Sequence, residues 1–223
     1  MIELKNITKT YKTTKIDTIT ALDNINLTFN TGELIILKGA SGSGKSTILS
    51  LLAGLSKPTS GEVIIDNKRI SKLPDDFATT YRQENIGFIF QKYNLIGGLS
   101  VKENIMLPLY PLNLDSNKLE QKANDIMEKF QIVHKKDIII NNLSGGEQQR
   151  TAIARAHINN PKIILADEPT ANLDETLSLS FIEILKELKQ ENKTIIVATH
   201  DPIFFNLKFV DRIIEISKGS ILS

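Results

Sequence analysis

The chain has 223 residues, which allows one large domain or a core with a small added subdomain. Lys and Arg number 27 against 26 for Asp and Glu, and this net charge of +1 argues against a protein that binds nucleic-acid phosphates. The absence of cysteine excludes disulfides and thiolate metal sites. Residues 1–6 lack the features of a signal peptide, and no apolar run approaches the roughly 20 residues of a membrane span. We therefore expect a cytoplasmic chain.

The first thirty residues and the later apolar runs predict two kinds of β structure. Residues 2–7 and 25–29 alternate around a polar stretch from Lys9 to Thr20, which favours antiparallel strands. Short continuous runs rich in β-branched residues are typical of strands buried on both faces of a parallel sheet. These runs are 34–37, 63–65, 86–90, 163–166 and 194–198.

Helical patterns lie between these strands. Two apolar stripes with helical spacing predict core-facing helices: Leu119, Ala123, Ile126, Met127 and Phe130 form one, and Leu177, Phe181, Ile184, Leu185 and Leu188 form the other. Residues from about 92 to 160 are mostly helical in pattern. We expect one domain over 1–223, with an α/β core from about 1–91 and 161–223 and a helical subdomain over about 92–160.

A phosphate-binding loop follows the first predicted core strand. Residues 39–47 match G-x-x-x-x-G-K-[ST], between the strand 34–37 and the helical run 48–55. Glycines let backbone N–H groups face phosphate oxygens, and a helix beginning near Lys45 adds its positive end. Lys45 would contact the β- and γ-phosphates and Ser46 a Mg²⁺ ion. The predicted ATP-binding residues are Gly39, Ala40, Ser41, Gly42, Ser43, Gly44, Lys45, Ser46 and Thr47.

Two adjacent acids end the predicted strand 163–166. Asp167 suits the coordination shell of Mg²⁺, and Glu168 can polarise an attacking water molecule. A solvated acid pair would be the structural alternative, but the phosphate loop favours a functional one.

A second loop of small residues opens a helix from Gln148 to about Asn159. It contains Ser144, Gly145, Gly146 and Glu147, and it is another anion-binding helix terminus. One nucleotide does not need two such cradles for the same phosphates in one subunit. We therefore expect this loop to contact a nucleotide held by a second copy, in a two-fold homodimer with two ATP molecules at the interface.

These segments together resemble the ATP-binding cassette family over essentially the whole chain. The segments are GASGSGKST, LSGGEQQR, LADEP and Thr199-His200-Asp201, in that order. The resemblance implies a P-loop NTPase (RecA-like) α/β core with an antiparallel β subdomain and a helical subdomain. It also implies ATP hydrolysis with Mg²⁺, an ATP-bound homodimer and an integral membrane permease as partner, with this chain peripheral at the cytoplasmic face of the cell membrane.

The same resemblance assigns roles to further residues. Gln91 looks like the glutamine that contacts Mg²⁺ and water and reports to the membrane partner. His200 resembles the switch histidine at the γ-phosphate, and Tyr11 lies where the family stacks an aromatic ring on adenine. The segment Ala171-Asn172-Leu173-Asp174 resembles the loop that crosses the dimer interface, where Asp174 is retained. Glu147 replaces a usual Gln, and Ala171-Asn172 replaces a more common Ser-Ala.

The segment after Gln91 is similar to one branch of this family. QKYNLI followed by LSVKENI resembles the lipoprotein-release, macrolide-export and cell-division branch, although Gly97 stands where a proline is usual. In that branch the ATPase works beside a separate permease with a large extracytoplasmic domain. This resemblance implies export or membrane extraction, and Leu95 and Ile96 are candidates for contacting the permease.

Three alternatives have weaker support. A GTPase would need Asn-Lys-x-Asp, and the Asn-Lys pairs at 67–68 and 117–118 lack the Asp. A small-molecule kinase would lack the Ser-Gly-Gly loop. A soluble ABC-type ATPase of DNA repair or translation would normally carry long coiled-coil inserts or two cassettes.

Overall fold

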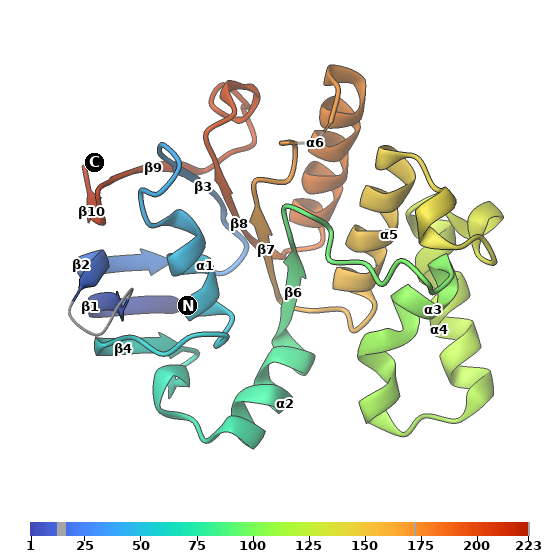
Figure 1. Cartoon of the computed structure of the whole chain (residues 1–223), viewed down its shortest axis with the longest axis horizontal. Helices are drawn as coiled ribbons and strands as arrows, with labels where there is room; N and C mark the ends of the chain where they lie inside the picture. The colour runs from blue at the N-terminus through green and yellow to red at the C-terminus, as the bar shows by residue number, and fades with distance from the viewer. Residues whose placement is uncertain (13–16, 172, 223) are drawn as a thin grey trace.

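The structure is a computed structural model that describes residues 1–12, 17–171 and 173–222. Within these residues, a six-stranded sheet in the order β10-β9-β3-β8-β7-β6 forms the centre of the molecule (Figure 1). Neighbouring strands are parallel except for β10 and β9. The strands are β3 Leu34–Lys38, β6 Ile86–Ile89, β7 Ile163–Asp167, β8 Thr194–Thr199, β9 Arg212–Ser217 and β10 Ser220–Ile221.

Four of the predicted strands are confirmed as neighbours in this sheet, namely β3, β6, β7 and β8. Alternate residues of β3, β7 and β8 enter two separate hydrophobic cores, because successive side chains on a strand point to opposite faces. Leu34 and Ile36 belong to one core, and Ile35 and Leu37 belong to the other. Burial on both faces explains the continuous apolar runs in the sequence.

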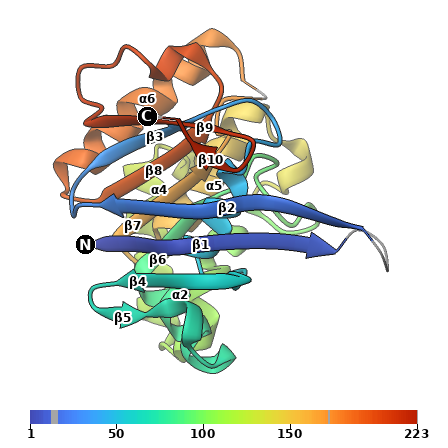
Figure 2. The ribbon, with the colours of Figure 1, turned by 90° about the vertical axis from the view of Figure 1, so that its left-hand side faces the viewer.

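The described residues also form a four-stranded antiparallel sheet in the order β2-β1-β4-β5 (Figure 2). Its strands are β1 Ile2–Lys12, β2 Thr18–Phe29, β4 Ser60–Ile65 and β5 Lys68–Arg69. The antiparallel prediction for the first thirty residues is confirmed, and the strands extend into the polar stretch that was expected to separate them. Residues 13–16 of that stretch lie outside the described part.

The prediction that 63–65 belongs to the parallel sheet is wrong. β4 pairs antiparallel with β1 and β5, on the smaller sheet. Val63 and Ile65 are buried whereas Ile64 between them is partly exposed, which is the alternation of a strand with one face on the core. Conversely, β9 was not singled out in the sequence, although it pairs parallel with β3.

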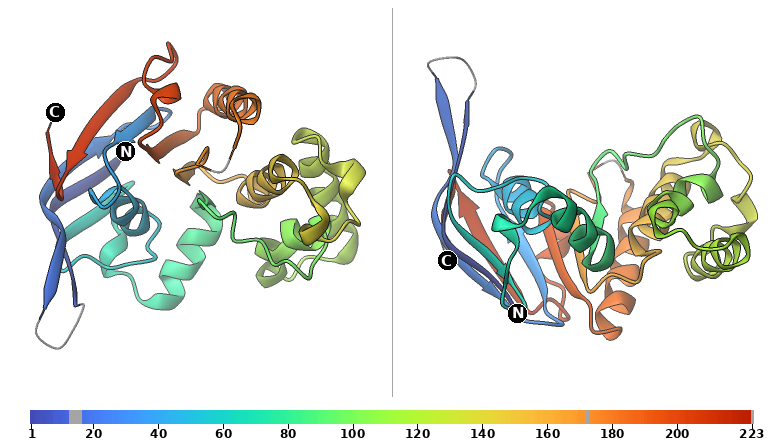
Figure 3. Two further views of the ribbon diagram at one scale, coloured as in Figure 1. Left: turned by 45° about the horizontal axis from the view of Figure 1, so that its top comes forward. Right: turned by 90° about the horizontal axis from the view of Figure 1, so that it is seen from below.

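Helices cover the two faces of the central sheet (Figures 1 and 3). α1 packs between the two sheets, where Ile48, Leu49 and Leu52 share a core with β1, β2 and β4. α5 and α6 pack on the opposite face. The helices are α1 Lys45–Leu52, α2 Asp75–Asn85, α3 Val101–Met106, α4 Ser116–Lys129, α5 Gly145–His157 and α6 Glu175–Gln190. Short 3-10 turns occupy Ile70–Lys72, Leu107–Leu112, Val133–Lys135, Ile140–Asn142 and Pro202–Phe204.

The segment from 92 to 160 carries α3, α4 and α5 and no assigned strand, so its helical prediction is confirmed. The first apolar stripe lies on α4 and its end, and its residues pack in the core shared with α5 and α6. The second stripe lies on α6, where Phe181, Leu185 and Leu188 are almost fully buried. None of the described helices is long and apolar enough to cross a lipid bilayer.

Candidate nucleotide site

A cavity of about 300 Å³ lies where the carboxyl ends of the parallel strands meet. It is lined mainly by the loop between β3 and α1, together with residues that follow β6, β7 and β8. The lining residues are Ala21, Ser41, Gly42, Ser43, Gly44, Lys45, Ser46, Thr47, Gln91, Glu168 and His200. Apart from Ala21, all of them were predicted as site residues. Ala21 comes from β2, and no sequence pattern identified it.

Close neighbours explain why glycine occupies two positions of the loop. A Cβ on Gly39 would lie 2.3 Å from the carbonyl oxygen of Ile216, and one on Gly44 would lie 2.7 Å from that of Ala21. Gly44 also has φ of +111°, in the left-handed region that favours glycine. The loop backbone therefore runs too close to β9 and β2 for a side chain at these two positions, and it leads into α1, which begins at Lys45 as expected.

Lys45 and Ser43 suit a bound anion. The Lys45 side chain is 5% exposed, and its Nζ donates to the carbonyls of Gly39 at 2.6 Å and Ala40 at 3.1 Å. The buried Oγ of Ser43 has no hydrogen-bond partner among the described residues. Buried polar atoms normally have partners, so an unpaired hydroxyl beside a buried cation fits phosphate oxygens in this cavity.

The acid pair lies opposite the loop. Asp167 ends β7 and accepts a hydrogen bond from Ser46 Oγ at 2.9 Å. Burial raises the pKa of Asp167, and the neighbouring Glu168 adds to this effect. Two adjacent protein oxygens, from a carboxylate and a hydroxyl, are the contribution that Mg²⁺ usually takes from a protein beside phosphates and water. The donor set therefore fits Mg²⁺.

Glu168 contacts both Lys45 and His200. Its Oε1 lies 3.2 Å from Lys45 Nζ and 3.0 Å from His200 Nδ1, and its Oε2 accepts from the His200 backbone N at 3.3 Å. Burial alone would raise the pKa of Glu168, but the bonds from His200 and Lys45 bring it below its usual value. Glu168 has φ of +44°, which is rare for a residue with a side chain and indicates local strain.

The remaining predicted residues lie elsewhere. Tyr11 is on β1, 40% exposed, with Lys9 Nζ 4.8 Å from its ring, and it does not line the cavity. Ser144 caps α5, where Ser144 and Glu147 form a capping box with both reciprocal bonds present. Asp174 caps α6 by accepting from the Leu177 N–H at 2.8 Å. Asn172, in the expected interface loop, lies outside the described residues.

The Ser-Gly-Gly segment does not contribute to this cavity in the single chain. No residue from Ser144 to Glu147 lines it. Ser144 and Gly145 are exposed. The helix begins at Gly145, three residues before the predicted start at Gln148, because the side chain of Ser144 already caps it.

A second cavity of about 340 Å³ lies between α2, β6 and α5. It is mostly apolar, and the rings of Phe88 and Phe90 stack in its wall with centroids 4.3 Å apart. The lining residues are Thr79, Arg82, Gln83, Ile86, Phe88, Phe90, Pro108, Pro111, Arg155, Ala156 and Asn159. Leu95 and Ile96, which were predicted to contact a permease, do not line this cavity, and Leu95 is partly buried against the core.

Comparison with known proteins places these motifs in a family. Residues 22–171 match the ABC transporter family. The ABC transporter ATP-binding protein MJ0796 of Methanocaldococcus jannaschii is 44% identical, and the match covers 99% of this chain and 95% of that protein. A solved dimeric structure of MJ0796, described as a post-hydrolysis state bound to ADP and Pi, superposes with a TM-score of 0.91 over 100% of this chain and 97% of that one.

Two other relatives carry functional names. The macrolide export ATP-binding/permease protein MacB of Campylobacter jejuni is 42% identical over 100% of this chain, which spans only 34% of MacB. A Staphylococcus haemolyticus relative named for hemin import, HrtA, is 42% identical over 99% of this chain and 98% of its own length. The phosphate loop, the acid pair, the Ser-Gly-Gly helix start and these matches lead to one identification: the chain belongs to the ABC transporter family and is its ATP-binding, ATP-hydrolysing cassette.

Proposed function

We propose that this chain is the ATPase subunit of an ABC transporter that drives export or membrane extraction through a separate permease, at the cytoplasmic face of the membrane. In this proposal the core at about 1–91 and 161–223 holds ATP, and the helical part at about 92–160 presents the Ser-Gly-Gly segment. The alternative is a soluble ABC-type ATPase that is not coupled to a permease. The apolar cavity beside Gln91 is the observation that favours the transporter.

Residues of one chain bind and orient the nucleotide. The loop amides of 39–47 and the Nζ of Lys45 face the phosphates, and Ser46, Asp167 and Gln91 hold Mg²⁺. When bound, Mg²⁺ supplies positive charge that offsets the charge of the β- and γ-phosphates. Tyr11 stacks on adenine in this proposal, which requires its ring to turn from Lys9 towards the cavity.

Glu168 and His200 act on the water that attacks the γ-phosphate. Although burial would raise the pKa of Glu168, the bonds from His200 and Lys45 bring it below its usual value, so the carboxylate can accept a hydrogen bond from that water. His200 is largely exposed and donates towards the γ-phosphate, while its contact with Glu168 at 3.0 Å aligns the two side chains. Neither side chain needs a large rearrangement, since both already line the cavity.

A second copy completes the site. In the single chain a Cβ on Gly145 would meet no atom within 4 Å, so nothing in its own fold requires a glycine there. A glycine does serve at a helix start that a phosphate approaches, because the backbone N–H groups are then uncovered. We therefore infer an ATP-bound homodimer in which Ser144, Gly145, Gly146 and Glu147 face the partner's nucleotide, with Asp174 at the interface.

The apolar cavity suits a helix of the permease, and hydrogen bonds connect it to the turn beside the nucleotide site. Arg155 of α5 lines this cavity, and its guanidinium donates to the carbonyls of Tyr93 and Asn94 at 2.5 and 2.6 Å. These two residues have positive φ and close the turn that follows Gln91. A partner seated between α2 and α5 would therefore act on Gln91 through this turn. An apolar helix in a groove is a common recognition mode.

The test is ATPase activity with and without the membrane protein that copurifies with this chain. We expect turnover to rise severalfold in the reconstituted complex and the gain to disappear when Phe88→Asp places a charge in the groove. Unchanged turnover with every copurifying membrane protein would support the soluble alternative.

Direction is tested by the architecture of the copurifying partner. Similarity to the macrolide-export branch favours export, whereas the name of HrtA indicates import for that protein. We expect mass spectrometry to identify a permease with a large extracytoplasmic domain, as in the export branch. A partner that lacks such a domain would contradict the export proposal and leave the ATPase assignment unaffected.

A further inference from the structure

One hydrogen bond joins the two turns that carry Glu168 and His200. Thr170, two residues after Glu168, is 4% exposed, and its Oγ1 donates to Asp201 Oδ2 at 2.7 Å. Asp201 directly follows His200. The Glu168 and His200 side chains meet at 3.0 Å on the cavity side of this bond. The bond is charge-assisted and buried on the Thr170 side, which places it among the stronger kinds.

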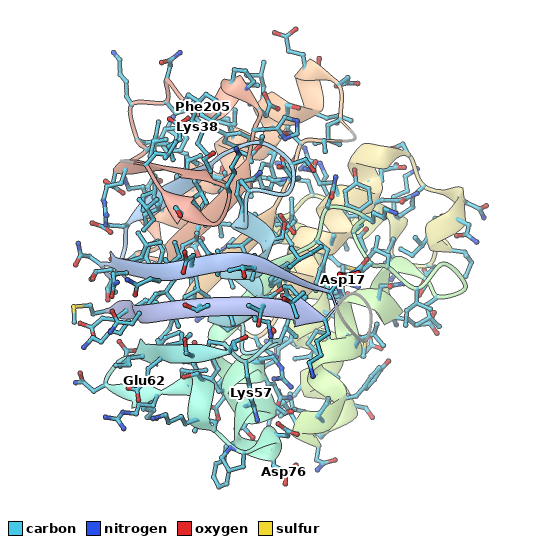
Figure 4. All side chains as sticks on the ribbon, turned by 60° about the vertical axis from the view of Figure 1, so that its left-hand side comes forward. Asp17, Lys38, Lys57, Glu62, Asp76 and Phe205 are labelled. Carbon is cyan, nitrogen blue, oxygen red and sulfur yellow. The ribbon has the colours of Figure 1, made fainter. Side chains whose placement is uncertain are left out.

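Asp201 is the anchored end of this bond. Its Oδ1 accepts from the Ile203 N–H at 3.1 Å, and its own N–H donates to Thr199 Oγ1 at 3.0 Å. The 3-10 turn that Asp201 caps leads to Phe205, whose ring lies 5.3 Å from Lys38 Nζ (Figure 4). Since Lys38 ends β3, the segment after His200 is held by the central sheet.

The turn after Glu168 is the strained end. Glu168 has φ of +44°, and its N–H donates to the Ala198 carbonyl at 2.8 Å. Strained backbone of this kind persists only where its surroundings hold it. Gln149, 3% exposed on α5, donates to the Pro169 carbonyl at 3.0 Å, and the bond from Thr170 to Asp201 lies one residue further on. Polar contacts from α5 and from the His200 turn therefore hold the strained turn after Glu168 in place.

We propose that Thr170 and Asp201 are positioning residues for ATP hydrolysis, whose hydrogen bond keeps Glu168 and His200 in register. The His200 side chain is 64% exposed, so its position depends on its contact with Glu168 and on the anchoring of its turn more than on packing. The proposal rests on the proposed roles of Glu168 and His200. Neither Thr170 nor Asp201 lines the cavity, so the bond acts on the alignment of the reacting groups and leaves nucleotide binding unchanged.

Steady-state ATP hydrolysis by the purified full chain tests this with two substitutions at one position. Thr170→Val keeps the shape and removes the hydroxyl, and we expect kcat to fall about tenfold, because small misplacements of reacting groups are costly. The KM for ATP should stay within about twofold. Thr170→Ser keeps the hydroxyl and should retain most of the activity. An unchanged kcat in Thr170→Val, equal losses in both variants, or a loss confined to KM would overturn the proposal.

Thr194→Val is the matched control. Thr194 is also 4% exposed and lies on the same β8 strand as Thr199 but at its other end, where its Oγ1 accepts from the Gly32 N–H at 3.0 Å. This variant loses a neutral hydrogen bond of an equally buried threonine, away from the site. We expect a similar decrease in melting temperature with an unchanged kcat. A loss of kcat as large as that of Thr170→Val would show general destabilisation instead.

A double-mutant cycle tests the bond itself. Asp201→Asn should lower kcat without changing KM, and the double variant with Thr170→Val should cost about as much as the larger single change. Costs that multiply would exclude the bond as their cause. If Thr170→Val does not fold, Asp201→Asn tests the proposal alone, and an unchanged kcat in that variant would overturn it. Glu168→Gln in the same assay separates the two proposals. Normal turnover in Glu168→Gln would remove the role of Glu168. Lost turnover in Glu168→Gln together with normal turnover in Thr170→Val would remove only the positioning role of Thr170.

Discussion

At the scale of single residues, the site works through two neighbouring acids in different surroundings. Asp167 is partly buried, and burial raises its pKa despite the hydrogen bond from Ser46; Glu168 is bonded to His200 and Lys45, and these bonds lower its pKa. Groups whose pKa values move apart in one cavity commonly have separate roles. Here Asp167 suits a metal ion, and Glu168 suits an attacking water.

Glu168→Gln tests that division. The amide keeps the size of the side chain but is a much weaker acceptor for the water, so we expect turnover to fall by about 10²- to 10³-fold with ATP affinity retained. Phosphate release and ATP titration followed by fluorescence give the two quantities. Turnover near the wild-type rate would remove Glu168 from the reaction.

Lys45→Ala tests the phosphate cradle. The variant loses a buried positive charge that faces the cavity, and charge-assisted bonds contribute about 1.5–3 kcal/mol, so the Kd for ATP should rise by about tenfold or more. Lys186→Ala removes an exposed lysine on α6 that pairs only with Glu183 in the described structure, and it should leave the Kd unchanged. Equal affinity in Lys45→Ala and the wild type would contradict the cradle.

At the scale of elements, the contribution of the start of α5 to the stability of the fold depends on pH. Two bonds from Ser144 and an ion pair with Lys135 at 3.0 Å lower the pKa of Glu147 to about 2, from 4.5 in the unfolded chain. Because the folded pKa is the lower one, this group stabilises the fold fully above about pH 4.5 and loses that contribution as the pH falls towards 2.

The comparison of wild type with Glu147→Gln measures this contribution. We expect the variant to unfold with about 1–2 kcal/mol less free energy at pH 7, and the difference to shrink by pH 3. Urea titrations at several pH values follow it. A difference of the same size at pH 7 and pH 3 would mean that the charge of Glu147 does not stabilise the helix start.

Arg155 connects α5 to the turn after Gln91. Arg155→Lys keeps the charge, but a single ammonium on a flexible chain does not reproduce the paired bonds to Tyr93 and Asn94. We expect the stimulation of ATPase activity by the permease to fall severalfold. Arg82→Lys is the control on the opposite wall of the groove, where Arg82 contacts Gly54 and Thr79; at saturating permease its stimulation should be retained.

The elements show what sequence could and could not predict. Continuous apolar runs identified β3, β6, β7 and β8, because burial on both faces leaves no polar positions. The same criterion misplaced 63–65, since a three-residue run is too short to reveal that Ile64 is partly exposed. α2 gave no signal, because only Ala78 and Tyr81 of it are buried. Sequence motifs predicted most residues that line the nucleotide cavity. Thr170 and Asp201, however, are 31 positions apart in the sequence, and no local pattern predicts their contact.

At the scale of the whole molecule, the two glycines at the start of α5 differ in their surroundings. A Cβ on Gly146 would lie 2.6 Å from the Leu177 side chain at the start of α6, so a side chain at this position would require Leu177 to move. Gly145 faces open space, and its own chain would tolerate a side chain there. The proposed homodimer would give a glycine at this position a role, since a partner's nucleotide would approach it.

This difference separates folding from assembly. Gly145→Ala should leave the melting temperature unchanged or raise it, because alanine is the better helix former by roughly 0.8–1 kcal/mol. Gly145→Asp should also fold, but it places a carboxylate where the partner's triphosphate would approach. Combined with Glu168→Gln to block hydrolysis, Gly145→Asp should stay monomeric with ATP and Mg²⁺ in light scattering, whereas Glu168→Gln alone should dimerise. A Gly145→Asp chain that dimerises as readily would show that the helix start does not meet the partner's nucleotide, and a Glu168→Gln chain that never dimerises would remove the shared site altogether.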